Sequence, residues 1–210
     1  MRDKKVRDKK MKQNNSLITT IVYIAIGVLV IGGAYSLGKS NSSSSSNAAA
    51  SPATLESLVG KPVPQFSLRD RDGIEYSSEN LKGKNIVLFF NEGLMCYPAC
   101  WSEVVALSKN SRLQNNDTVT LSIEPDSASS WQQAIKKMPE LGNAKTVFDT
   151  DRKVSKSFGA LTVASSMHYG SLPGHSYVVI DKDGIVQYVY DDPSMAGNGD
   201  LIADEVEKLN

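Results

Sequence analysis

The sequence has 210 residues, and its 23 Lys and Arg residues balance its 23 Asp and Glu residues. This balance hides an asymmetry, because seven basic residues lie in residues 1–16 and one in residues 38–52, which leaves residues 53–210 with 15 basic and 21 acidic residues. Binding of nucleic-acid phosphates requires a basic face, so this acidic region is predicted to have no nucleic-acid partner.

A basic tail (residues 1–16) precedes an uncharged apolar stretch at residues 17–37. As a helix, this stretch would be about 31 Å long, enough to cross a hydrocarbon core of about 30 Å, and it is apolar on every face. We expect a single transmembrane helix over residues 17–37 in the cell membrane, with a cytoplasmic N-terminus because positive charges stay on that side. A signal peptide cleaved at Gly33-Ala34 is the alternative.

Residues 38–52 read GKSNSSSSSNAAASP and have little apolar surface to bury, which predicts a flexible linker. Residues 53–210 have the length of one domain. The predicted topology places this domain outside the cytoplasm, where disulfides persist. Its two cysteines are therefore expected to rest oxidised and to need a reductant, whose identity the sequence leaves open.

The first elements of the domain are predicted to be extended. Two prolines disfavour helix over residues 60–68, and residues 70–76 form a turn and a returning strand, which predicts a hairpin. Residues 86–90 (IVLFF) form an apolar run without alternation. Both faces of this strand should therefore be buried, in the centre of a sheet covered by helices.

Cys96 and Cys100, the only cysteines, lie between this strand and a helix predicted over residues 101–113. Unpaired N–H groups and the positive end of the helix dipole favour a thiolate there, which indicates a redox or metal-binding site. A buried structural disulfide or two inert thiols is the alternative. On one helix, Cβ atoms four residues apart are about 5–6 Å apart, whereas a disulfide needs about 3.5–4.5 Å, so Cys96 must precede the helix if the two bond.

Strands and helices alternate after the cysteines. Predicted, in chain order, are strand 118–123, helix 130–138, strand 146–149, helix 152–158, strand 176–181, its hairpin partner 185–190 and helix 201–209. This order predicts an α/β fold of thioredoxin type, with a central mixed sheet flanked by helices. The predicted fold class is this domain preceded by the single transmembrane helix.

Short motifs follow one another in a fixed order through the domain. They are GKPxPxFxL at 60–68, DG at 72–73, LKGKxIVLFF at 81–90, SIEPD at 122–126, FD at 148–149 and YVVIDKDG at 177–184. This order resembles the alkyl-hydroperoxide-reductase and thiol-specific-antioxidant (AhpC/TSA) family, which comprises the peroxiredoxins and their thioredoxin-like relatives.

The resemblance assigns roles to four residues. Cys100 corresponds to the family's peroxidatic cysteine, and Tyr97 stands where the family has a threonine that orients peroxide. His175 corresponds to an arginine that stabilises the thiolate, although a neutral imidazole supplies less positive charge. Cys96 precedes Cys100 like the first cysteine of thioredoxin-like reductases, with one residue more between them. The implied activity is a cofactor-free thiol-dependent oxidoreductase with an antioxidant role, acting on peroxide or on a protein thiol or disulfide.

A copper chaperone is a second interpretation. The Cys-x3-Cys pair and a distant histidine also resemble the Sco-type copper chaperones, which are membrane-tethered and extracytoplasmic. Two thiolates and an imidazole suit copper, and the ligands would be Cys96, Cys100 and His175. His168 and Met167 are additional candidates. A noncatalytic binding domain is the remaining possibility.

Two acidic residues, Glu92 and Glu103, flank the cysteines. A carboxylate there could relay protons or raise the thiol pKa by repulsion, and Glu103 is a candidate catalytic residue for this reason. Solvated charges at a helix end are the interpretation that we expect for both.

Overall fold

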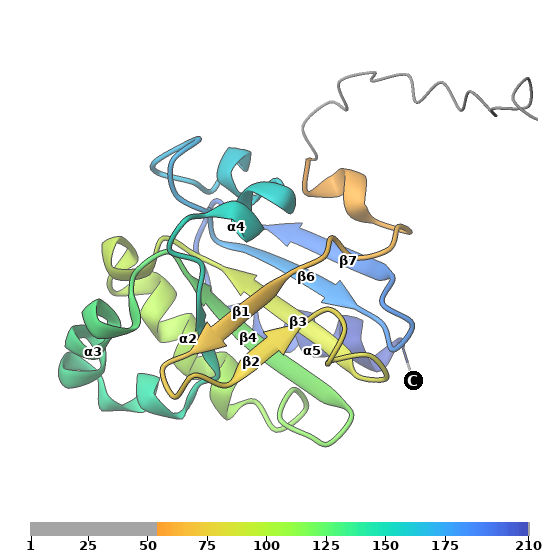
Figure 1. Cartoon of the computed structure of the whole chain (residues 1–210), viewed down its shortest axis with the longest axis horizontal. Coiled ribbons are helices and arrows are strands. Elements are labelled where there is room, and N and C mark those ends of the chain that lie inside the picture. Colours follow the sequence, from red (N-terminus) through yellow and green to blue (C-terminus); the bar gives the residue numbers. More distant parts are fainter. Residues whose placement is uncertain (1–53, 210) are drawn as a thin grey trace, which may run out of the picture. The chain divides into compact units, whose positions relative to one another are not determined.

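A computed structural model describes residues 54–209 of the chain (Figure 1). The predicted tail (1–16), transmembrane helix (17–37) and linker (38–52) lie outside the described residues and stay predictions. Within residues 54–209, no helix combines the length and the apolar character that crossing a membrane requires.

The strands of residues 54–209 form one mixed sheet, in the order β2-β1-β5-β4-β3-β6-β7. Their bounds are β1 (Ser67–Asp70), β2 (Glu75–Ser77), β3 (Asn85–Phe90), β4 (Thr118–Glu124), β5 (Thr146–Phe148), β6 (Ser176–Ile180) and β7 (Val186–Asp191). The pairs β3–β4 and β4–β5 are parallel, and the other pairs are antiparallel. The predicted mixed sheet and both predicted hairpins are thereby confirmed.

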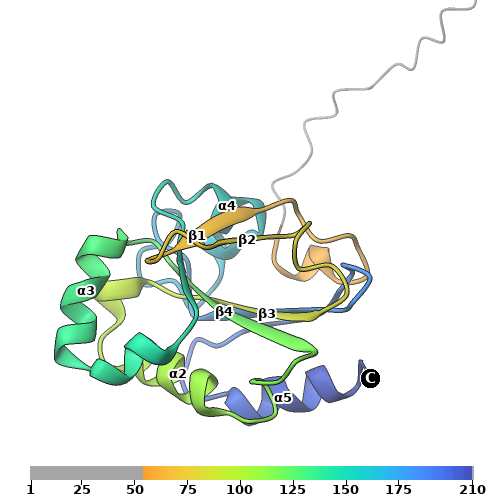
Figure 2. The same ribbon diagram turned by 60° about the horizontal axis from the view of Figure 1, so that its bottom comes forward.

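Helices cover both faces of this sheet. They are α2 (Ala99–Lys109), α3 (Ala128–Lys137), α4 (Lys153–Ser157) and α5 (Gly199–Glu207), with the short 3-10 helices η1 (Glu56–Leu58), η2 (Gly93–Cys96), η3 (Pro139–Asn143) and η4 (Ala160–Thr162). Figure 2 shows β3 and β4 between two layers, with α4 and the β1–β2 hairpin on one side and α2 and α5 on the other.

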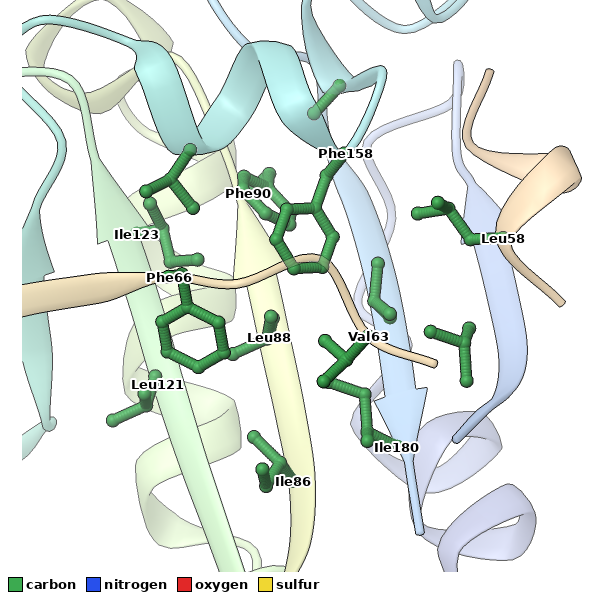
Figure 3. Close-up of a cluster of buried hydrophobic side chains, with 14 of the residues drawn as sticks. Leu58, Val63, Phe66, Ile86, Leu88, Phe90, Leu121, Ile123, Phe158 and Ile180 are labelled. Atoms are coloured by element: carbon green, nitrogen blue, oxygen red, sulfur yellow. The ribbon is translucent and has the colours of Figure 1, made fainter. Parts of the chain in front are cut away.

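The central strand β3 is buried along its whole length, as its unbroken apolar run predicts. Alternate side chains enter different cores because successive residues of a strand point to opposite faces. Leu88 and Phe90 pack with Phe158 beneath α4 (Figure 3). Val87 and Phe89 belong to the other core, which also contains both cysteines. The site therefore rests on the α2–α5 face of the sheet.

The helix predicted over residues 101–113 is shorter at its C-terminal end than expected. Helix α2 ends at Lys109 because Asn110 leaves the helical conformation and uses its side chain twice. Its Oδ1 accepts a hydrogen bond from Arg112 N at 3.0 Å, and its Nδ2 donates to Gly199 O at 3.1 Å. These bonds offer the chain an alternative to another helical turn, as asparagine side chains often do.

Candidate active site

The two cysteines lie where β3 gives way to α2. The loop after β3 forms η2, which ends at Cys96, and α2 begins at Ala99 with Pro98 as its N-cap residue. A disulfide joins Cys96 and Cys100 across a Cα–Cα distance of 5.4 Å. Cys96 precedes the helix, as the spacing argument requires, and both cysteines are buried.

Polar contacts fix the loop that carries Cys96. Gly93 has a φ of 60°, and a Cβ there would collide with the Asp126 carboxylate. Asp126 Oδ2 accepts a hydrogen bond from Leu94 N at 2.8 Å, and the indole Nε1 of Trp101 donates to Gly93 O at 3.1 Å. Only glycine combines this close approach with a left-handed backbone at little cost. The loop is thus held on both sides, by α2 and by the segment after β4.

A buried carboxyl supports the same loop from β4. Asn91 Nδ2 donates to Glu124 Oε1 at 3.0 Å, and Asn91 Oδ1 accepts from Gly93 N at 2.8 Å. The other Glu124 oxygen has no hydrogen-bond partner among the described residues. Burial raises the pKa of Glu124 to about 8, an effect that the Asn91 bond opposes and that Asp126 reinforces. At pH 7 this carboxyl is therefore mainly protonated.

His175 lies beside the disulfide, with its Nδ1 3.5 Å from Cys100 Sγ. It sits in the loop that enters β6, where a Cβ on Gly174 would collide with the Ser165 side chain, so the glycine lets the two segments approach. The Phe89 ring meets the imidazole edge to face, with ring centroids 4.7 Å apart. The structure thus brings together Cys96, Cys100 and His175.

Burial lowers the pKa of His175 to about 4, and the charges of Asp192 and Asp191 oppose this shift only in part. The imidazole is therefore neutral at pH 7. Beside the disulfide, it can accept or donate a hydrogen bond at the sulfur without carrying a charge.

The hydrogen bonds of His175 continue away from the sulfur. Its Nε2 lies 2.9 Å from the Tyr177 hydroxyl, which donates to Glu103 Oε1 at 3.0 Å. Glu103 Oε1 also accepts from Asn198 N at 3.2 Å. Burial raises the pKa of Glu103, while the Tyr177 and Asn198 bonds oppose the shift. Glu103 is therefore linked to Cys100 through the side chains of Tyr177 and His175.

The prediction that Glu92 and Glu103 are solvated is wrong. Glu92 is 1% exposed and Glu103 is 2% exposed. Glu103 points inward because its helix face meets β6, and Glu92 is enclosed by the loop that contains His168. His168 Nδ1 lies 2.8 Å from Glu92 Oε2, and His168 N donates to Glu92 Oε1 at 2.9 Å.

Tyr97, which was matched to a peroxide-orienting threonine, has 61% of its surface exposed. Its ring contacts the edge of Trp101, with centroids 4.8 Å apart. The structure therefore places it at the rim of the site, beside the buried sulfurs.

The three predicted copper ligands form one group in the structure. One ligand atom from each of Cys96, Cys100 and His175 lies within 4.8 Å of the others. His168 is not in this group, and its ring contacts Glu92 instead. A buried pair of thiolates with a neutral imidazole could hold a soft metal ion once the disulfide is reduced.

Sequence reasoning missed Tyr177, although a signal for it was present. Residues two apart on an extended chain point to the same face of a sheet. Tyr177 in β6 is two positions after His175, so both side chains are expected to face the α2 side of the sheet. Tyr177 stacks on Phe89, with ring centroids 4.8 Å apart, which holds its hydroxyl between His175 and Glu103.

Comparisons with known proteins give these features a family context. The AhpC/TSA family matches residues 59–189. Chloroplastic peroxiredoxin Q of Triticum aestivum is 32% identical over 139 residues, which cover 62% of this chain and 58% of that protein. Peroxiredoxin Bcp of Escherichia coli (strain K12) is 27% identical over 147 residues, which cover 69% of this chain and 92% of that protein.

A solved structure supports the fold. The crystal structure of Enterococcus faecalis AhpC superimposes with a TM-score of 0.62 at 17% identity, covering 72% of this chain and 91% of that chain. The thioredoxin-like α/β fold predicted for residues 53–210 is therefore confirmed over the part that the structure describes. Because the family match spans more than half of the sequence, this chain belongs to the AhpC/TSA family.

Proposed function

We propose that this chain is a membrane-anchored, extracytoplasmic thiol–disulfide oxidoreductase with peroxiredoxin-like antioxidant activity, whose redox pair is Cys96 and Cys100. The observation that carries the proposal is the disulfide between these cysteines, next to the buried imidazole of His175. Membership of the AhpC/TSA family supports the same chemistry. The proposed reaction uses no metal or organic cofactor, because the cysteine pair itself accepts two electrons as a disulfide and donates them as a dithiol.

In the reducing half-reaction, a thiolate of the reductant attacks Cys96 Sγ and the bond to Cys100 breaks. Cys100 leaves as a thiolate beside His175, and a second thiol of the reductant then displaces Cys96. Two electrons and two protons pass to the protein, which becomes a dithiol, while the reductant becomes a disulfide.

In the oxidising half-reaction, the Cys100 thiolate attacks a peroxide and breaks its O–O bond. Cys100 becomes a sulfenic acid, and the leaving oxygen takes a proton to form an alcohol or water. The Cys96 thiol then attacks the sulfenic sulfur, restores the disulfide and releases water. Reduced full-length protein mixed with hydrogen peroxide should therefore return to the disulfide and remove one peroxide per disulfide formed. A dithiol that neither peroxide nor a protein disulfide oxidises would contradict the proposal.

Exposed apolar side chains near the site support a protein thiol or disulfide as one partner. They are Met95 (60% exposed), Tyr97 (61%), Met167 (56%) and Tyr169 (70%). The two loops that carry them are joined by the contact between Glu92 and His168. Aromatic and methionine side chains are enriched in protein–protein interfaces, and a partner seated here would lie against the loop that contains Cys96.

The membrane anchor is proposed from the basic tail and the apolar stretch at residues 17–37. A membrane-impermeant thiol reagent should label Cys96 and Cys100 in intact cells after reduction by an impermeant phosphine. Labelling only after the membrane is opened would contradict the extracytoplasmic orientation.

A copper chaperone is the second candidate, and the compact group of Cys96, Cys100 and His175 favours it. Copper would be its cargo, held by two thiolates and the neutral imidazole after reduction of the disulfide. The oxidoreductase and the copper chaperone give His175 different roles. A single substitution of His175 therefore distinguishes the two functions.

For His175→Ala we expect slower thiol–disulfide turnover and unchanged Cu(I) affinity if the protein is an oxidoreductase. Turnover should slow because the imidazole contacts Cys100 Sγ and assists protonation of that sulfur. Cu(I) affinity should stay unchanged because, in an oxidoreductase, any Cu(I) that binds would be held by the two sulfurs. Competition with a Cu(I) chelator and turnover with a dithiol measure the two effects. His168→Ala is the matched control, because it removes a histidine outside the group. A large loss of Cu(I) affinity with normal disulfide formation would favour the chaperone.

A further inference from the structure

An unbroken hydrogen-bonded chain runs from the redox sulfur to a buried carboxyl. Its links are Cys100 Sγ to His175 Nδ1 (3.5 Å), His175 Nε2 to the Tyr177 hydroxyl (2.9 Å) and the Tyr177 hydroxyl to Glu103 Oε1 (3.0 Å). Each of the four residues is at most 2% exposed. Water therefore has no direct access to the sulfur along this side of the molecule.

The far end of the chain lies against a surface groove between α2 and the start of α5. Glu103 lines this groove, which has a volume of about 570 Å³. Its Oε2 is buried and has no hydrogen-bond partner among residues 54–209. Gly197, which also lines the groove, packs against this oxygen: a Cβ added to that glycine would lie 3.4 Å from Oε2. A small opening of the segment around Gly197 would bring groove water to the carboxyl.

We propose that Glu103 is the proton acceptor and donor of Cys100, acting through Tyr177 and His175, and that the groove between α2 and α5 is where this proton exchanges with solvent. The inference deepens the proposed thiol chemistry and rests on it. Tyr177 and Glu103 are positioning and relay residues, since neither contacts the sulfur.

Proton transfer along the chain moves three protons, each across one hydrogen bond. The Cys100 thiol gives its proton to His175 Nδ1, His175 Nε2 gives its proton to the Tyr177 oxygen, and the Tyr177 hydroxyl gives its proton to Glu103. The result is a Cys100 thiolate, a neutral imidazole, a neutral phenol and a carboxylic acid. The reverse shift protonates Cys100 when it leaves the disulfide as a thiolate.

This shift keeps the total charge of the buried site constant. One negative charge moves from the carboxylate to the sulfur, so no additional charge enters a region that solvates charge poorly. Burial has already raised the pKa of Glu103, and Asp192 adds to that effect, so the carboxylate accepts a proton more readily than an exposed one. The charged groups that face the chain are Asp191 and Asp192 at the end of β7, and Lys109, Arg112 and Asp200 around the groove.

Tyr177→Phe tests the relay, because it keeps the ring that stacks on Phe89 and removes only the hydroxyl. In full-length protein carrying Cys96→Ser, Cys100 is the one remaining thiol, and infrared spectra recorded at pH 7 report both ends of the chain. The spectrum of this parent minus that of the same protein with Glu103→Gln should contain a carboxylic-acid C=O band from Glu103. The Cys100 S–H band should be weaker in the parent than in the Glu103→Gln variant, because glutamine cannot accept the proton.

With Tyr177→Phe, the Glu103 carboxylic-acid band should be lost and the Cys100 S–H band should appear at pH 7, and alkylation of Cys100 at pH 7 should slow by about tenfold, equivalent to one pKa unit. Tyr190→Phe is the matched control, because Tyr190 stacks on Tyr177 with centroids 6.2 Å apart but lies outside the chain. It should behave like the parent.

Two results would overturn the relay: thiolate formation without a carboxylic-acid band in the parent, or a Tyr177→Phe variant indistinguishable from the parent. The infrared signal needs only reduced Cys100 and no turnover. Failure of the redox function would instead appear as an inert dithiol with this coupling intact.

Discussion

Cys100→Ser is expected to abolish peroxide consumption and thiol–disulfide exchange altogether. Cys100 lies in the first turn of α2, where the helix dipole and unpaired N–H groups favour the thiolate, and it is the sulfur in contact with His175. A serine hydroxyl has a far higher pKa and cannot form a disulfide. Peroxide-dependent sulfenic acid, trapped with a dimedone-type reagent and detected by mass spectrometry, should disappear with the substitution.

Cys96→Ser should act differently, because it leaves the nucleophile and removes only its partner. Oxidised Cys100 should then accumulate as a sulfenic acid or as a mixed disulfide with an added thiol. Ser102→Ala, an exposed position on the same helix, should leave both readouts unchanged. If Cys96 alone reacts with alkylating reagents at low pH, the roles of the two cysteines are the reverse of those proposed.

Glu124→Gln is expected to change the pH dependence of stability by several kcal/mol. The folded-state pKa of Glu124 is about 8, against an ordinary value of 4.5. Below pH 4.5 the carboxyl is protonated in both the folded and the unfolded state, so its ionisation does not reduce stability. Between about pH 4.5 and 8 only the unfolded state ionises, so the free energy of unfolding falls as pH rises, by about 1.4 kcal/mol per unit and about 4–5 kcal/mol in total.

Glutamine keeps the oxygen that accepts from Asn91 and cannot ionise, so this decline should be missing. The free energy of unfolding of Glu124→Gln should therefore exceed that of the parent by an amount that grows between pH 5 and pH 8. Urea unfolding at fixed pH values measures this difference. Glu140→Gln, at an exposed position in η3, is the control and should give a parallel curve. A constant difference between Glu124→Gln and the parent across this range would show that Glu124 is already ionised in the folded state.

Much of the fold was predictable, because single segments determine it. An apolar run without alternation requires a central strand, and β3 indeed lies between β4 and β6 with both faces buried. The turn before β2 and the turn before β7 each carry a glycine with positive φ, Gly73 and Gly184, which made both hairpins recognisable. Helix ends were less predictable, since the end of α2 depends on a contact between Asn110 and a residue far along the chain.

The candidate site was likewise predictable only in part. The placement of Cys96 before the helix follows from local geometry, and the approach of His175 follows from the topology of the fold. The burial of Glu92 and Glu103 did not follow, because each is enclosed by a segment more than 70 residues away. A pattern of residue types does not reveal such long-range enclosure, and the hydrogen-bonded chain through Tyr177 became visible only in three dimensions.

The proposed redox role is tested most directly by asking whether Cys96 and Cys100 interconvert between disulfide and dithiol. Full-length protein would be equilibrated with thiol–disulfide buffers of graded potential, quenched with an alkylating reagent and weighed by mass spectrometry. We expect one reversible two-electron transition in which both cysteines gain or lose the alkyl label together. A disulfide that stays intact across the whole range until the protein unfolds would contradict the proposed redox role, because it would make the bond structural.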